Sequence, residues 1–389
     1  MKIAILNEST EWGGLESHAV DLSRVFLELG HEVTLICLVP GADRLFAERT
    51  PDKVRIIGVR APGPRGARAA LHSIEPDCIV FEKGTLHAGG WLLDLVCRLH
   101  ARRYVVIEQL EAPPLPARTS KRHWGVVPGV GLWWYRWRLR GFARSMLPHL
   151  VVCISVSVRD RLSSDYLFPE RKLRLIPHGV DTKRFRPDPE ARARVRRTWQ
   201  VDEGTVVFGS IRRFVRDKGL DVAVRAFAEM DRRRPGRALL VLIGEGPERE
   251  SLGRLAQDLG ISARVRMEPY TSAPWEVYPA FDTFVMPSRI EALGVALIEA
   301  MAAGCSVIAS RVGGIPEMIP NAEIGFLVEP DDVSALSAEM DRCAAMTPAE
   351  RQAAGRAARA HVETHFEMRQ QYLRIADLLT SSTLSRTAS

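Results

Sequence analysis

Residues 1–30 read MKIAILNESTEWGGLESHAVDLSRVFLELG and contain the unit that is repeated along the whole chain. The apolar run at 3–7 predicts a buried strand, and Gly13 and Gly14 predict a turn after it. Apolar residues then recur at helical spacing, and Gly30 supplies the helix end. They are Leu15, Ala19, Leu22, Phe26 and Leu29. A strand followed by such a helix is typical of parallel α/β sheets.

This alternation continues in two series. Strands are predicted at 3–7, 33–38, 54–59, 78–82, 104–108 and 151–155, and again at 206–211, 239–243, 265–267, 283–286, 307–309 and 326–328. A proline-rich, charged stretch at 177–189 separates them. A chain of 389 residues also suits two domains. We therefore predict an α/β protein with two Rossmann-like domains, 1–183 and 184–365, that face each other across a cleft.

Composition excludes several protein classes. Apolar residues make up 46% and charged residues 26%, which is typical of a globular protein and not of a disordered one. The six cysteines are widely spaced and form no zinc pattern, so we expect reduced thiols and no metal. No apolar stretch approaches the roughly 18 residues of a membrane span, and the start runs directly into a strand. We expect a cytoplasmic protein.

The net charge of +7 arises from one basic window. Residues 112–159 contain eight arginines or lysines and no acidic residue. Within the window, 131–147 combines tryptophan and tyrosine with arginine, which favours peripheral contact with an anionic membrane. The alternative is a helix that packs its tryptophans inward. Nucleic acid is not an expected partner, because no recognition module is present.

The first candidate site is the loop at Gly13 and Gly14. Glycines at the start of a helix let a ligand approach backbone N–H groups, where the helix dipole favours an anion such as a diphosphate. A plain turn is the alternative. A dinucleotide site fits poorly, since no G-x-G-x-x-G pattern is present.

The second candidate is a pair of carboxylates, Glu291 and Glu299, in a loop and in the helix after it. The helix is apolar on nearly all sides, so we expect Glu299 to be largely buried and to need a polar ligand or an arginine. Helical rise places Glu299 roughly 8 Å beyond Gly294, a span that suits a nucleotide sugar. Alternatively, Glu299 pairs with a framework arginine and Glu291 is a solvated loop residue.

The third candidate is cationic. Arg213 and Lys218 follow the predicted strand at 206–211, at the edge where ligands of open α/β sheets bind. Such cations can neutralise the charge of a departing diphosphate without a metal. A solvated basic surface is the alternative. The loops at 244–247 and 313–317 open toward the same edge, although glycine loops are also ordinary turns.

Taken together and in order, these motifs resemble the family 4 glycosyltransferases, retaining enzymes with the two-domain GT-B fold. The most specific element is the E-x7-E segment from Glu291 to Glu299, followed by 300–304. Around it stand IPHGVD at 176–181, the 213–219 segment, GEGP at 244–247, GGIPE at 313–317 and GFLV at 325–328.

The resemblance implies roles for individual residues. Glu291 contacts the donor sugar, Glu299 binds the ribose, and Arg213 and Lys218 bind the diphosphate, so that Glu291, Arg213 and Lys218 form the catalytic group. The implied donor-binding residues are Gly14, Gly244, Glu245, Gly246, Ala292, Leu293, Gly294, Val295 and Glu299. The resemblance also implies that 366–389 forms a C-terminal helix that crosses back to the first domain, followed by a tail.

One departure from the family concerns the acceptor side. Family members often carry histidines after the fourth and fifth strands of the first domain, where this chain has Glu82 and Glu108. Glu108 matches by position, and His87 lies slightly downstream, so both are acceptor-side candidates. In this family the leaving phosphate is usually described as helping to deprotonate the acceptor, so a missing histidine does not imply an inactive enzyme.

The predicted activity is that of a retaining hexosyltransferase. It moves a sugar from a nucleotide sugar, which is a substrate and not a cofactor, to a hydroxyl of a lipid-linked or cell-envelope glycan at the inner face of the cell membrane. A nucleotide-sugar epimerase of the same fold and a non-catalytic partner protein are the alternatives.

Overall fold

The computed structural model describes residues 1–9, 13–84, 90–109 and 139–380. The chain divides into two compact units. Unit 1 contains Met1–His178 and the chain from Arg369 onward, and unit 2 contains Gly179–Met368. The chain therefore leaves unit 1 five residues earlier than the predicted boundary at 183 and re-enters it after Met368.

Unit 1 is built on a seven-stranded parallel sheet in the order β3-β2-β1-β4-β5-β6-β7. The strands are β1 (Lys2–Asn7), β2 (Glu32–Cys37), β3 (Arg55–Gly58), β4 (Cys78–Lys83), β5 (Arg103–Glu108), β6 (Leu150–Cys153) and β7 (Leu173–Leu175). β1 and β4 are buried along almost their whole length, as expected for strands covered on both faces.

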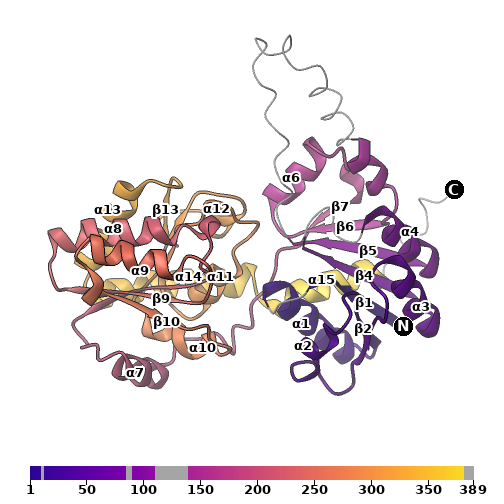
Figure 1. The fold of residues 1–389 in the computed structure, drawn as a ribbon, viewed down its shortest axis with the longest axis horizontal. Coiled ribbons are helices and arrows are strands. Elements are labelled where there is room, and N and C mark those ends of the chain that lie inside the picture. The colour runs from indigo at the N-terminus through magenta and orange to yellow at the C-terminus, as the bar shows by residue number, and fades with distance from the viewer. Residues whose placement is uncertain (10–12, 85–89, 110–138, 381–389) are drawn as a thin grey trace, which may run out of the picture. The chain divides into compact units, whose positions relative to one another are not determined.

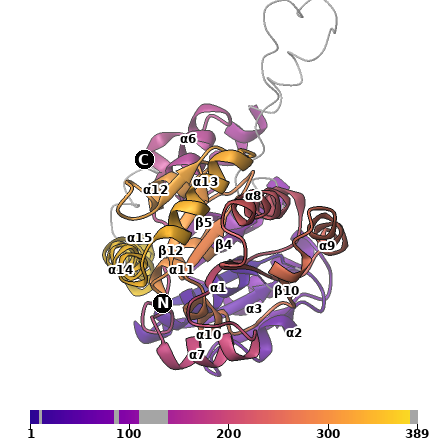
Figure 2. The same cartoon turned by 90° about the vertical axis from the view of Figure 1, so that its left-hand side faces the viewer.

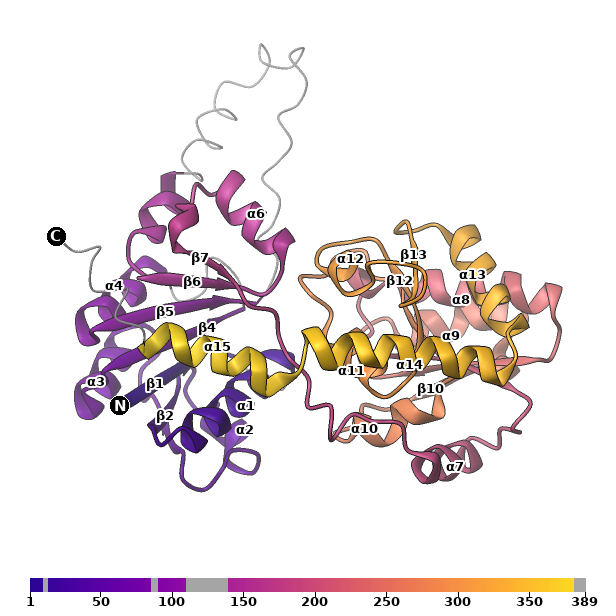
Figure 3. The same cartoon turned by 180° about the vertical axis from the view of Figure 1, so that it is seen from behind.

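Helices connect these strands (Figure 1). They are α1 (Gly14–Glu28), α2 (Asp43–Ala47), α3 (Pro64–Ile74), α4 (Gly90–His100) and α6 (Val156–Ser164), and residues 139–145 are also helical. α15 (Met368–Thr380) belongs to unit 1 from Arg369 onward (Figure 3). It buries Tyr372, Ile375 and Leu379. An arginine anchors it as well, since Arg374 donates to the carbonyl of Leu175 over 2.9 Å.

Unit 2 has a six-stranded parallel sheet in the order β10-β9-β8-β11-β12-β13. The strands are β8 (Val206–Ile211), β9 (Ala238–Ile243), β10 (Val265–Glu268), β11 (Thr283–Met286), β12 (Ser306–Ser310) and β13 (Phe326–Val328). The order reverses at β8, and ligands of such sheets bind outside the carboxyl ends of the strands at the reversal. The predicted α/β class with two Rossmann-like units is confirmed.

The helices of unit 2 cover its sheet. They are α7 (Pro189–Thr198), α8 (Leu220–Arg233), α9 (Arg249–Asp258), α10 (Pro274–Val277), α11 (Val295–Ala302), α12 (Ile315–Met318), α13 (Val333–Ala345) and α14 (Pro348–His365). α8 packs between α9 and α13 (Figure 2). Its Phe227 joins Phe208 and Leu240 of the sheet in one buried core. α14 packs beside α11.

The two segments that enter and leave unit 2 are joined to each other. The N–H of Val180 donates to the carbonyl of Phe366 over 2.8 Å, and the N–H of Met368 donates to the carbonyl of Val180 over 3.1 Å. A Cβ on Gly179 would stand 2.3 Å from the Cα of Met368. The glycine of the IPHGVD motif is therefore needed for this close backbone approach.

Candidate functional site

In unit 2, the loops that follow β8, β9, β11 and β12 interlock through glycines. A Cβ on Gly244 would stand 1.8 Å from the carbonyl oxygen of Arg212, and one on Gly246 would stand 2.3 Å from that of Phe214. A Cβ on Gly313 would stand 1.5 Å from the carbonyl oxygen of Glu291. All three glycines have a positive φ. Any larger residue at these three positions would collide with the neighbouring backbone. The glycines therefore let the loops pack against each other along the carboxyl edge of the sheet.

Glu291 lies at the centre of this edge with two cations on one oxygen. Its Oε2 accepts from Arg212 over 2.5 Å and from Lys218 over 2.9 Å. Burial raises the pKa of Glu291, but the two cations outweigh it and the net shift is downward. Burial is also the main cause of the lowered pKa of Lys218. Glu291 is thus held ionised and pre-oriented.

Arg212 is a site residue that the sequence reasoning missed. Its side chain is only 4% exposed, whereas the neighbouring Arg213 is exposed. Adjacent arginines look alike in sequence, which does not show which of the two is buried. The sequence gives no alternation that marks Arg212, because β8 is buried at every position from Val206 to Ser210 and Arg212 lies at the bend after the strand. Arg212 donates to Glu291 and holds its carboxylate in place, whereas the side chain of Arg213 is exposed to solvent.

The start of α11 provides backbone donors next to Glu291. Gly294 is the N-cap residue with φ +104, and Val295 begins the helix. Ala292 and Leu293 are buried and hold the loop in place. The first N–H groups of a helix have no partner within the helix, and together with the helix dipole they favour an anion. Glu245 is different, because it is exposed and its carboxylate lies 4.0 Å from Arg249.

Glu299 corrects one prediction. It is half-buried instead of largely buried, and the hydroxyl of Tyr278 donates to its Oε2 over 2.8 Å. The helix buries Leu297, Ile298, Ala300 and Met301, but Val295, Ala296 and Glu299 stay half-open. Because Glu299 follows Ala296 by three residues and Val295 by four, the three side chains lie on one side of the helix. The accessible side of α11 could not be predicted from the sequence, because two of its three residues are apolar.

The acceptor-side candidate Glu108 lies in a buried charge cluster of unit 1. Lys83 and Arg144 contact the two oxygens of Asp94 over 2.5 and 2.9 Å, and Tyr104 donates to Asp94 over 2.5 Å. Lys83, Asp94, Arg144 and Glu108 line one small cavity. Burial raises the pKa of Glu108 to about 7, although Lys83 and Arg144 oppose the shift. His87, the other candidate, lies outside the described residues.

This pKa gives a prediction for Glu108→Gln. A carboxyl whose pKa is raised on folding stabilises the fold at pH below its unfolded value of 4.5, and the contribution is lost as pH rises through about 7. We expect wild type to lose ~3 kcal/mol of unfolding free energy relative to the variant over this range. Urea unfolding at pH 5 and 8 measures it, with the exposed Glu48→Gln as control. Parallel pH profiles for wild type and Glu108→Gln would contradict the assignment.

The structure also brings a histidine to the end of β4. His18 of α1 lies 2.8 Å from Glu82, and Gln109 donates to the other oxygen of Glu82. Burial lowers the pKa of His18 to about 3 and raises that of Glu82 well above its usual value, so the pair is neutral. The sequence places His18 and Glu82 64 residues apart, which is why the pair was not predicted.

Gly14, the first residue of α1, is exposed, and a Cβ there would meet nothing within 4 Å.

Membrane-spanning helices and metal-binding clusters are both absent from the described residues. None of their helices combines the length and apolarity that crossing a bilayer needs. Across 1–9, 13–84, 90–109 and 139–380, no group of three or more His, Cys, Asp or Glu residues is arranged to hold a metal ion.

Two family models match the chain, one per unit. A model described as Glycosyltransferase Family 4 matches residues 12–184, and one described as Glycosyl transferases group 1 matches residues 191–361.

Curated proteins that are similar in sequence to this chain are also glycosyltransferases. A GDP-mannose-dependent alpha-(1-6)-phosphatidylinositol monomannoside mannosyltransferase of Mycolicibacterium smegmatis is 35% identical over 269 residues, which is 65% of this chain and 69% of that protein. The protein of the same name from Mycobacterium tuberculosis is 35% identical, with 56% and 61% covered. A D-inositol 3-phosphate glycosyltransferase of Nocardia farcinica is 38% identical over 44% of this chain and 41% of its own length.

Solved structures share the fold over the whole chain. Alr3699/HepE of Anabaena, in complex with UDP, superposes with a TM-score of 0.80 at 18% identity, covering 98% of this chain and all of its own. WaaG, a glycosyltransferase involved in lipopolysaccharide biosynthesis, gives a TM-score of 0.74 at 18% identity with the same coverage.

Proposed function

This chain belongs to glycosyltransferase family 4 and is a glycosyltransferase, and from this premise we propose that it transfers a sugar from a nucleotide sugar to an acceptor hydroxyl with retention of configuration. The observation that carries the proposal is the ionised Glu291, held by Arg212 and Lys218 beside the start of α11. It combines an acceptor for sugar hydroxyls with a cation and helix amides for a diphosphate.

Each residue has a distinct part in this proposal. Glu291 accepts hydrogen bonds from the donor sugar and keeps its charge because Arg212 stays with it. Lys218 and the exposed Arg213 neutralise the diphosphate as it departs. Glu299, on the open stripe of α11, accepts from the ribose hydroxyls. The proton of the acceptor hydroxyl passes to the leaving phosphate, so no strong protein base is required.

For the donor, GDP-mannose is the first compound to test, because the mannosyltransferase relatives are named for it. A thermal-shift comparison with GDP-mannose, UDP-glucose and ADP-glucose identifies the donor, since a bound ligand raises the melting temperature. Proton NMR of the product then reports its anomeric configuration. An inverted product, or no stabilisation by any nucleotide sugar, would refute the proposal.

For the acceptor, we propose a hydroxyl of a lipid-linked or cell-envelope glycan at the inner face of the cell membrane. Both groups of curated relatives are named for acceptors that contain a phosphorylated inositol, so a phosphatidylinositol mannoside is the first acceptor to test. The epimerase alternative is distinguished by incubating the protein with donor alone. An epimerase converts the donor, whereas a transferase leaves it intact apart from slow hydrolysis.

Replacement of Glu299 by alanine tests its assigned role. Loss of hydrogen bonds between a carboxylate and the ribose is expected to weaken donor binding by about 10- to 100-fold, with a smaller change in turnover. Calorimetric titration with the donor measures this, and Glu250→Ala, an exposed glutamate on α9, is the matched control. Equal donor affinity in the Glu299→Ala and Glu250→Ala proteins would remove Glu299 from the site.

A further inference from the structure

Exposed apolar side chains gather on one part of unit 1. Among the described residues, eleven large hydrophobic side chains are exposed, and six of them lie on α4 or at 139–146. The six are Trp91, Leu92, Leu99, Leu139, Phe142 and Met146. Trp91 is 59% exposed and Leu99 is 72% exposed. Scattered single residues of this kind are normal on protein surfaces, but a cluster indicates an interaction site.

α4 exposes a stripe of apolar side chains. Trp91, Leu95 and Leu99 follow one another at spacings of four residues and form a stripe on the open side. The opposite side of the helix buries Leu93, Asp94 and Cys97, and the carboxylate of Asp94 is held by Lys83 and Arg144. α4 therefore carries apolar side chains on its exposed side as well as on its buried side, whereas a surface helix usually has a polar outer side. The buried ion pairs fix the orientation.

The helix at 139–145 repeats the pattern. Arg144 points inward to Asp94, while Leu139, Phe142 and Met146 are exposed at spacings of three and four residues. α4 joins β4 to β5, and this helix precedes β6, so right-handed crossovers put both on the same face of the sheet. The Arg144–Asp94 contact of 2.9 Å confirms that they are neighbours. Their exposed side chains thus form one surface, called the α4 surface below.

The charges of the α4 surface have one sign. Arg102 and Arg140 are exposed, and Arg98 lies half-exposed beside the apolar stripe. The only acidic residue of α4 is the buried Asp94, and residues 139–150 contain none. Protein interfaces exclude charge from their centres, whereas a layer of anionic lipid attracts apolar side chains surrounded by arginines. Charge complementarity therefore favours a bilayer over a second copy of the chain.

We infer that the α4 surface docks on an anionic lipid bilayer and holds unit 1 where a lipid-linked acceptor is embedded. The inference rests on the proposed function for the nature of the acceptor. It assigns membrane contact to α4 and 139–146, whereas the sequence pattern predicted it for 131–147. Trp91, Leu92 and Leu99 enter the interfacial region, and Arg98, Arg102 and Arg140 meet lipid phosphates.

Vesicle sedimentation tests the inference. The full chain is mixed with vesicles of phosphatidylcholine plus phosphatidylglycerol, or of phosphatidylcholine alone. We expect binding to the anionic vesicles only, weakened by added salt. The Trp91→Ser/Leu99→Ser protein is expected to bind roughly tenfold or more weakly, and the Arg98→Glu/Arg140→Glu protein at least about fivefold more weakly. Leu29→Ser, at the end of α1, is the matched exposed control and should bind as wild type.

Three outcomes would overturn the inference: no binding of the wild-type chain to anionic vesicles, unchanged binding of both double variants, or a wild-type dimer that the serine variants dissociate. Sugar transfer to a water-soluble acceptor is measured in parallel. It should be equal in wild type and both double variants, because none of the changed residues is among the donor-binding or acceptor-side residues named above. Failure of that transfer in the wild-type protein counts against the proposed function alone, since vesicle binding needs no donor.

Discussion

Replacing Lys218 with alanine is expected to lower turnover by about 10²- to 10³-fold, the usual effect of removing one preorganised charge that stabilises a transition state. The ammonium of Lys218 lies 2.9 Å from the carboxylate of Glu291. We expect it to act when the diphosphate departs, because only then does new negative charge appear beside it. Donor affinity should change less than turnover.

Arg212 allows the effect of Lys218 to be measured separately from that of Glu291. When Lys218 is removed, Glu291 keeps a buried arginine at 2.5 Å and stays ionised, so the variant loses one cation without losing the carboxylate. Steady-state kinetics with the identified donor give kcat and KM separately. Lys183→Ala removes an exposed lysine of unit 2 and is the matched control. If the two alanine variants have the same kcat, Lys218 does not stabilise the departing phosphate.

Much of the fold was predictable because parallel strands are nearly continuous apolar runs. The predicted strands at 206–211, 283–286 and 326–328 have the same bounds as β8, β11 and β13. β7 was missed, since its three residues include the exposed Arg174 and give no apolar run. Family membership followed from short motifs that stayed in order, and the family models confirm it.

The site was less predictable than the fold, because the direction of each side chain decides which residues reach the site. Sequence spacing singled out Glu291 and Lys218, and the structure brings them into contact. It could not separate Arg212 from Arg213, or show that α11 leaves Glu299 half-open. Glu82 was noted only as a departure from the family, and its partner His18 lies on α1, 64 residues away. Such pairs depend on how helices pack on the sheet, which local patterns do not encode.

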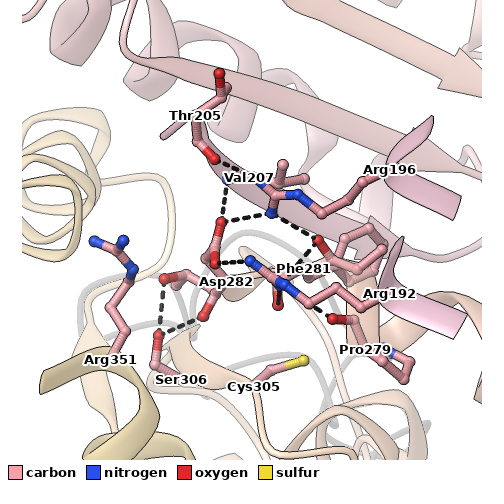
Figure 4. Close-up of polar contacts among 12 residues, drawn as sticks. Arg192, Arg196, Thr205, Val207, Pro279, Phe281, Asp282, Cys305, Ser306 and Arg351 are labelled. Atoms are coloured by element: carbon pink, nitrogen blue, oxygen red, sulfur yellow. Dashed lines mark hydrogen bonds and ion pairs between the residues drawn. The ribbon is translucent and has the colours of Figure 1, made fainter. Parts of the chain in front are cut away.

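Replacing Asp282 with alanine is expected to cost about 3–5 kcal/mol of unfolding free energy. Asp282 precedes β11 and accepts from Arg192 over 2.8 Å, from Arg196 over 3.1 Å and from the N–H of Val207 over 2.7 Å (Figure 4). Arg196 is only 2% exposed, so the variant leaves a buried guanidinium without its counter-ion. The lost contacts also join α7 to the start of β8.

An exposed ion pair of α7 serves as the comparison, because it also joins an arginine to a carboxylate, as in the Asp282 network, but is not buried. Arg194 of α7 contacts Glu276 of α10 over 3.1 Å, but both side chains are more than half exposed, so Glu276→Ala should cost less than about 1 kcal/mol. By calorimetry we expect Asp282→Ala to lower the melting temperature by roughly 10 °C and Glu276→Ala by only a few degrees. Asp282 lies at the amino end of β11, whereas Glu291 follows its carboxyl end, so the folded Asp282→Ala protein should still bind donor. Similar melting temperatures for the two variants would show that the Arg192–Asp282–Arg196 network does not stabilise unit 2.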